Sequence, residues 1–190
     1  MTLIALPAHR YERQRWRNDA GFTREIARGG EAPDWRVSIA ELREGCQFSR
    51  FEGCARQLIL LSGAGLSLAV DEAPSQALAQ PFASLRFSGD SKVAADLSDG
   101  PCEAFNLIYR PDVVDAVVMH RPLLGSMVLF LRPGQQWLLH LAGGHACLQE
   151  AELKLDLAQG DSAWLQGDAG RVRLEGGGDL LLVRIERRDG

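Results

Sequence analysis

The sequence predicts an all-β protein built from jelly-roll-like barrels. Residues 35–40 (WRVSIA) alternate large apolar with polar or small side chains, the period of a strand with two different faces. Leu58–Leu61 is a short apolar run that ends at the glycine-containing turn Ser62–Gly65, and Leu66 begins the next strand. No long amphipathic helix is evident. Short strands every 8–12 residues, separated by Gly and Asp turns, are typical of jelly-roll barrels.

The first part of the chain reads as extended residues 3–7, a charged segment, and a turn over Asn18–Gly21. Asn and Gly tolerate positive φ, so Phe22–Ile26 is expected to leave this turn as a strand. Asn18 has two interpretations. It either forms the turn alone, or the turn also directs the Asn18 amide and the Thr23 hydroxyl into a pocket.

Three further strands are expected before residue 120. They cover Leu85–Phe87, Phe105–Arg110 and Val113–Met119. The last of these is bounded by Pro111 and Pro122, and its valines favour a strand over a short helix.

A repeated pattern of turns in the two halves of the chain indicates a duplicated β unit. The glycine turn at 61–65 and the Gly-Asp turn at 87–90 have counterparts at 141–145 and 165–168. In the second half, 153–157 and 162–165 are expected to be strands, and a turn at Gly176–Asp179 is expected to precede a buried strand at 180–185. The predicted domains are a first barrel with the pocket over 1–120 and a second over 121–190. In this prediction the N-terminal strands can swap into the second barrel, and the two barrels are expected to pack as one unit.

Composition excludes several classes of protein. The net charge is −4 and the 21 Lys and Arg residues form no basic run, so a nucleic-acid partner is not expected. The first residues do not have the pattern of a signal peptide and there is no apolar run of about 20 residues, so neither a signal peptide nor membrane association is expected. The four cysteines lack CxxC spacing, which favours reduced thiols and a cytoplasmic protein.

Residues 160–165 (GDSAWL) resemble the Gly-Asp turn of cupin barrels, and the duplicated layout resembles a bicupin. More specifically, the chain resembles the HutD/Ves family through five pieces in order: Trp16-Arg17-Asn18 with Gly21 and Thr23; 35–40; 48–53 with Arg56; 87–90; and 105–107. Asp19 is a departure, because the family usually has Gly after the Asn. The resemblance implies a cytoplasmic bicupin associated with histidine utilisation or its regulation.

No metal, other cofactor or catalytic residue is expected. Metal-binding cupins use an HxH pair with further ligands, whereas His140 and His145 are five apart and His9 and His120 are isolated. The chain has neither a GxSxG elbow nor a GxGxxG segment that opens a helix.

Polar residues on several strands form the candidate ligand-binding site. Arg36 and Ser38 share one strand face, Asn106 and Arg110 share another, and Arg56 leads into a third strand. Guanidinium, hydroxyl and amide groups in a barrel suit a small carboxylate, because Arg donates to both of its oxygens. The complete candidate set is Asn18, Thr23, Arg36, Ser38, Arg56, Asp90, Asn106 and Arg110. Alternatively, these arginines form structural salt bridges with Glu41, Glu52 or Asp90, while Trp16 and Trp35 are core residues and Arg15, Arg17, Arg24 and Arg28 are solvated surface.

Two functions follow. The first is a non-enzymatic bicupin that senses a small anionic metabolite of the urocanate or N-formylglutamate type. The second is a metal-free isomerase or hydrolase acting on a related acid, with Asp90 or Glu52 as general base. A structural or partner-binding role ranks behind these two functions, and a homodimer is compatible with all of them.

Overall fold

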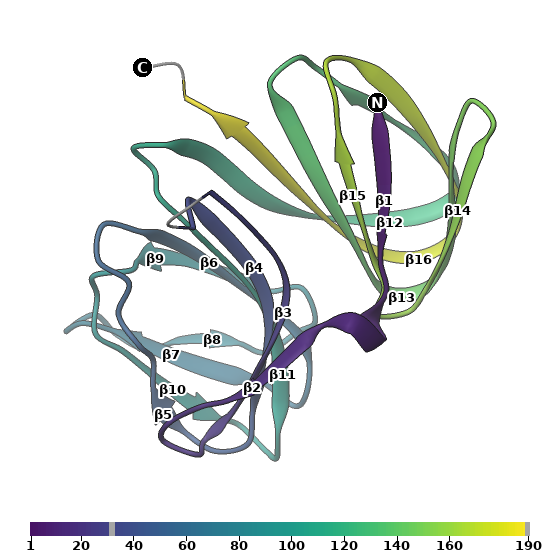
Figure 1. Cartoon of the computed structure of the whole chain (residues 1–190). Coiled ribbons are helices and arrows are strands. Elements are labelled where there is room, and N and C mark those ends of the chain that lie inside the picture. The colour runs from purple at the N-terminus through teal and green to yellow at the C-terminus, as the bar shows by residue number, and fades with distance from the viewer. Residues whose placement is uncertain (31–32, 189–190) are drawn as a thin grey trace. The chain divides into compact units, whose positions relative to one another are not determined.

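The computed structural model describes residues 1–30 and 33–188, and the all-β prediction is confirmed. In the described part of the chain, strands are joined by turns and by one short 3-10 segment, Ala8–Arg10. The chain divides into two compact units, drawn in Figure 1. One contains Glu12–Val113. The other contains Met1–Tyr11 together with the chain from Val114 onward.

The Glu12–Val113 unit contains two antiparallel sheets. The larger has the order β2 (Glu12–Arg15), β3 (Gly21–Gly29), β4 (Trp35–Leu42), β11 (Cys102–Tyr109), β6 (Ala55–Ser62), β9 (Ser84–Ser88). The smaller has the order β5 (Cys46–Gln47), β10 (Val93–Leu97), β7 (Leu66–Val70), β8 (Gln76–Leu78). The strands expected near residues 22–26, 35–40, 58–61, 85–87 and 105–110 are therefore confirmed.

Strand register explains why this unit has an apolar interior at one end and a polar one at the other. Ala104 of β11 pairs with Ala40 of β4 and Leu60 of β6, and all three belong to the buried core. Four residues further along β11, Ile108 pairs with Arg36 and Arg56. Paired residues of an antiparallel sheet point to the same face, so both arginines face the interior.

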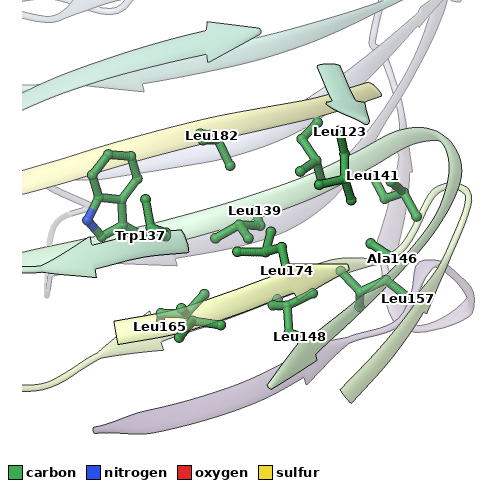
Figure 2. Packing of buried hydrophobic residues seen from close by; sticks show 14 of the residues in the cluster. Leu123, Trp137, Leu139, Leu141, Ala146, Leu148, Leu157, Leu165, Leu174 and Leu182 are labelled. Atoms are coloured by element: carbon green, nitrogen blue, oxygen red, sulfur yellow. The ribbon is translucent and has the colours of Figure 1, made fainter. Parts of the chain in front are cut away.

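The other unit is built on one sheet with the order β1 (Thr2–Leu6), β15 (Ser162–Gln166), β13 (Gln135–Glu150), β16 (Gly170–Arg187), β12 (Val114–Leu131), and β14 (Leu153–Ala158) pairs with β13. The strands expected at 113–119, 153–157, 162–165 and 180–185 are confirmed. Side chains from β12 to β16 converge on one apolar cluster, which includes Leu139, Leu148 and Leu174 (Figure 2).

The glycine turns expected at 141–145 and at Gly176–Asp179 are wrong. Both segments lie inside the continuous long strands β13 and β16, where Gly144 pairs with Gly178. A Cβ on Gly178 would lie 1.9 Å from the carbonyl oxygen of Gly143. These glycines therefore allow two strands to bend against each other rather than end.

The unit boundary also differs from the expected division at residue 120. Val114 begins β12, which pairs with β16 along its whole length, so residues 114–120 join the later part of the chain. Residues 1–11 join it as well, because β1 pairs with β15 and the Tyr11 hydroxyl donates to the carbonyl oxygen of Gly160 at 2.8 Å.

We expect the charge cluster around Glu41 to make stability pH-dependent. Arg13 Nη2 lies 2.6 Å and Arg24 Nε 2.7 Å from this carboxylate, and the Arg13 hydrogen bond is the main reason that the pKa of Glu41 is lowered. A depressed carboxyl pKa contributes stability above its unfolded value, near pH 4.5, and that stability is lost as pH falls through the folded value. Glu41→Gln should reduce the free energy of unfolding by about 1 kcal/mol at pH 7 and by less at pH 3.

Urea unfolding at several pH values measures this effect. Glu72→Gln is the matched control, because Glu72 is exposed and has no ion-pair partner within the described residues. The same loss for Glu41→Gln at pH 3 as at pH 7 would contradict the assignment.

Candidate ligand-binding site

The Glu12–Val113 unit contains a cavity of about 370 Å³, within the size range of small-molecule sites. Its lining residues are Gln14, Arg15, Trp16, Arg17, Asn18, Thr23, Arg36, Ala40, Gln47, Phe48, Ser49, Phe51, Arg56, Leu58 and Asn106. Four of these side chains are arginines and none is a carboxylate. The cavity is therefore electropositive.

The inner wall follows from the strand register already described. Arg36 and Arg56 flank Ile108 in one cross-strand row, and Asn106 lies in the next row between Ser38 and Leu58. The rows beyond carry small and aliphatic side chains that fill the core. At one end of the adjacent strands β4, β11 and β6, the residues that face the interior are therefore polar, and the cavity lies at this end.

Arg56 is the central residue of this wall and is only 6% exposed. Its guanidinium carbon lies 5.2 Å from the Phe48 ring centroid, 5.3 Å from that of Phe51 and 4.9 Å from that of Phe87. Aromatic rings attract a cation but accept no conventional hydrogen bond from it. The remaining contacts must therefore satisfy its N–H groups.

Those contacts are few. Nη1 donates to the Ser49 carbonyl oxygen at 3.2 Å, and Nη2 donates to Asn106 Oδ1 at 3.5 Å, the outer limit of a hydrogen bond. Nε is buried and has no hydrogen-bond acceptor among the described atoms. An unsatisfied buried donor on a charged group is costly, and an entering anion would satisfy it.

Electrostatics reinforce this conclusion. Burial, and then the positive charge of Arg36, lower the pKa of Arg56 to about 10. Burial also lowers the pKa of Arg36, although Glu25 opposes the shift. Neither guanidinium forms an ion pair with a carboxylate in residues 1–30 or 33–188. The charge of Arg36 thus lowers the pKa of Arg56, which lies buried in the cavity without an ion-pair partner among the described carboxylates.

The outer wall comes from β2 and the turn that follows it. Trp16 Nε1 donates to Thr23 Oγ1 at 2.7 Å, and the indole packs edge-on against Phe48 with ring centroids 6.4 Å apart. Asn18 Oδ1 accepts from the Ala20 amide at 3.3 Å, and Asp19 adopts a φ of 61°. Asn18 therefore forms the turn and also lines the cavity.

Of the eight candidate residues, five line the cavity: Asn18, Thr23, Arg36, Arg56 and Asn106. Ser38 points to the same face of β4 but is 1% exposed and does not reach the lining. Asp90 accepts from Ser88 Oγ at 3.2 Å, which stabilises its own turn, and from the Gly53 amide at 3.1 Å, which connects this turn to the segment before β6. Arg110 follows the end of β11 and pairs with Asp112 at 2.7 Å, outside the cavity lining.

The alternative interpretation, in which the candidate arginines form salt bridges with Glu41, Glu52 or Asp90, does not hold for Arg36 or Arg56 in the described chain. Glu41 pairs with Arg13 and Arg24 instead. Neither Asp90 nor Glu52, the residues considered as general bases, is among the lining residues.

Several lining residues were not predicted. Arg15 and Arg17 were expected to be solvated surface, and they are exposed, but they also line the cavity. No sequence pattern marked Gln14 or Gln47 as a candidate for the binding site. Phe48 and Phe51 belong to one of the pieces that resemble the HutD/Ves family, which was the available indication of their importance.

No group of three or more His, Cys, Asp or Glu residues is arranged to hold a metal ion within the described residues. His140 is buried, and its Nδ1 lies 3.0 Å from Ser162 Oγ, which in turn lies 2.7 Å from the Tyr11 hydroxyl. This hydrogen-bonded chain links residues 1–11 to β13 and β15. In the described part of the chain, no helix is long and apolar enough to cross a bilayer.

Comparison with protein families shows that the HutD family model matches residues 8–182. An uncharacterised 21.2 kDa protein in the hutC 3' region of Pseudomonas putida is 46% identical over 113 residues, 57% of this chain and 59% of that protein. Protein Ves of Escherichia fergusonii is 40% identical over 101 residues, 50% of this chain and 51% of that protein. The matches thus span little more than half of these relatives.

Two solved structures match over the full length. HutD from Pseudomonas fluorescens SBW25 has a TM-score of 0.86 at 30% identity, covering 99% of this chain and all of the other. A conserved protein of unknown function from Pseudomonas aeruginosa PAO1 has a TM-score of 0.88 at 31% identity, covering 100% of both chains. Oxalate decarboxylase from Lactobacillus farciminis matches at 11% identity with a TM-score of 0.67, covering 97% of this chain and 86% of the other, which shows only a shared cupin-like fold.

Proposed function

The chain belongs to the HutD family, and from this membership together with the arginine-lined cavity we propose that it binds a small carboxylate metabolite without turning it over. The metabolite is of the urocanate or N-formylglutamate type, and its binding reports on histidine utilisation. The gene region of the Pseudomonas putida relative supports that link. The buried and unpaired Arg56 carries the proposal.

The chemistry favours a carboxylate over a neutral ligand. A guanidinium offers forked N–H donors that match the two oxygens of a carboxylate, and charge-assisted hydrogen bonds are stronger than neutral ones. In the cavity, such an anion would supply the counter-charge that Arg56 lacks. The Phe48 and Phe51 rings restrict access of water to Arg56, which strengthens an ion pair there.

We also propose a bicupin in which each unit forms one cupin-like barrel. Each unit has its own strands and its own apolar cluster, and the solved structures of similar fold include cupin-like proteins. The protein is proposed to act in the cytoplasm, in keeping with its four free cysteines.

A thermal-shift screen against acids of histidine breakdown tests the binding proposal. A ligand present at a hundredfold excess over its Kd stabilises the native state by about 2.7 kcal/mol, so one acid should raise the melting temperature saturably. Arg56→Met should abolish this shift, whereas the control Arg110→Met removes a guanidinium outside the cavity and should respond like the wild type. Absence of a shift with every acid of the panel would contradict the proposal.

A further inference from the structure

Strand β12 lies at one edge of the sheet in the unit that contains Met1–Tyr11 and the chain from Val114 onward. Among the described strands it pairs with β16 alone, so the backbone N–H and C=O groups along its other edge have no strand partner. Such an edge is a template for pairing with another strand. We propose that the free edge of β12 pairs antiparallel with β12 of a second copy of this chain, which gives a two-fold symmetric dimer.

The last part of β12 lacks the features that protect most edge strands. Natural edges are commonly short, or carry charged residues or proline, whereas residues 123–131 (LLGSMVLFL) contain neither a charge nor a proline. Three outward side chains are large and apolar: Leu124 is 87% exposed, Phe130 65% and Val128 45%. A continuous apolar edge of this kind indicates a surface that another protein chain covers.

Strand geometry restricts the register of the pairing. Gly125 has a φ of +86°, which interrupts the extended backbone, so the regular part of the free edge is Ser126–Leu131. Leu129 belongs to the apolar core of its unit, whereas Val128 and Phe130 face outward. Directly opposite residues of antiparallel strands share a face, so only registers that keep Leu129 inward are allowed. Pairing about Leu129 itself places Val128 of each copy opposite Phe130 of the other.

This register is self-complementary. Each of the two rows would hold a valine opposite a phenylalanine, a favourable cross-strand pair. Within one chain, Arg171 of β16 lies opposite Phe130 and Arg173 lies opposite Val128, so an arginine would flank each apolar pair on either side. The two arginines of a row would be about 14 Å apart, beyond the Debye length of about 8 Å, so their repulsion is largely screened. Arg173 also pairs with Glu175.

A second copy suits this edge better than a charged partner does. A two-fold interface brings identical surfaces together, which an uncharged apolar strand tolerates and a charged one does not. The three exposed side chains present on the order of 350 Å² of apolar surface. Two copies would cover much of this area together with their strand backbones, a total near the lower end of specific interfaces, about 1,200 Å². A weak dimer that forms as the protein concentration rises is therefore expected.

Sedimentation equilibrium over a series of concentrations tests this inference. The wild type should pass from monomer to dimer. Two double variants place like charges at the facing positions: Val128→Lys with Phe130→Lys, and Val128→Glu with Phe130→Glu. Each variant alone should raise the dissociation constant of the dimer at least about tenfold. Their equimolar mixture should restore the dimer, because each facing pair is then a lysine opposite a glutamate.

Leu153→Lys is the matched control, because Leu153 is 57% exposed but belongs to β14, which pairs with β13. This variant should dimerise like the wild type. A wild type that stays monomeric up to about 1 mM, or a dimer that both double variants leave intact, would overturn the inference. A mixture that stays monomeric although circular dichroism shows both variants to be folded would also overturn it. The arginine-lined cavity belongs to the other unit, so none of these outcomes depends on the proposed function.

Discussion

Replacement of Gly178 by alanine is expected to be among the most destabilising single substitutions in the protein. Gly178 has a φ of +143°, and an added Cβ would lie 1.9 Å from the Gly143 oxygen and 2.8 Å from the Gly143 carbonyl carbon. Both contacts are with the backbone of β13, so no side chain can move aside. The long strands β13 and β16 would have to separate where they bend, at a cost of about 3 kcal/mol or more.

Gly134→Ala is the matched control for this effect. Gly134 has a φ of +79°, also outside the region favoured by alanine, but an added Cβ there would meet no atom within 4 Å. Its expected cost is therefore only the conformational one, about 1 kcal/mol. Urea unfolding of the two variants gives the comparison. Similar losses of free energy would show that close packing at the bend is not what requires glycine at position 178.

The second large effect is a gain of stability that accompanies a loss of binding. Arg56→Met should abolish binding of any acid and raise the free energy of unfolding of the ligand-free protein by about 1–2 kcal/mol. Burial, and then repulsion by Arg36, lower the pKa of Arg56 to about 10, which corresponds to an unfavourable free energy of roughly 3 kcal/mol for the charged form. Attraction to the phenylalanine rings offsets part of this cost, and a methionine keeps some of that contact through its sulfur.

Chemical denaturation without ligand measures the gain. Arg110→Met serves as the control, because an exposed arginine paired with Asp112 should change stability by no more than about 0.5 kcal/mol. If Arg56→Met instead destabilises the protein by several kcal/mol, Arg56 is a structural residue, and its lack of a counter-ion carries no functional meaning. A gain of stability at the expense of binding is common when a binding residue that lies in an unfavourable environment is replaced.

The inner wall of the site was largely predictable from the sequence. A period of two residues determines which side chains of a strand share a face, so the alternation in 35–40 already placed Arg36 and Ser38 together. Register then decides which residues of neighbouring strands meet, and it brought Asn106 beside Ser38. The prediction that Arg110 shares a strand face with Asn106 did not hold, because β11 ends at Tyr109. Beyond that residue, alternate side chains no longer point to the same face.

The outer wall was not predictable in the same way. Arg15 belongs to an edge strand whose residues are all exposed, and exposed arginines normally indicate solvated surface. Its position against the cavity depends on the turn at Asn18–Gly21 and on how β2 pairs with β3. The prediction for Asp90 was wrong for a local reason, since a side chain that stabilises its own turn has the same sequence pattern as one that faces a site.

The long bent strands were missed because glycine has two structural uses. The sequence predicts a turn at Gly176–Asp179, because turns are the commoner use of consecutive glycines. Their actual role depends on Gly143 and Gly144 lying opposite them, a pairing between residues more than thirty positions apart. The pairing of β1 with β15 is equally non-local, so residues 1–11 could not be assigned to their unit with certainty from the sequence.

The most direct test is nuclear magnetic resonance of the Arg56 side chain in ¹⁵N-labelled protein, with Arg56→Met identifying its Nε–H signal. The Nε–H group is buried and has no acceptor among the described atoms. A carboxylate that binds as proposed should move this signal downfield and slow its exchange with water, because a charge-assisted hydrogen bond is formed. An acid that binds tightly but leaves the Arg56 signal unchanged would contradict the account.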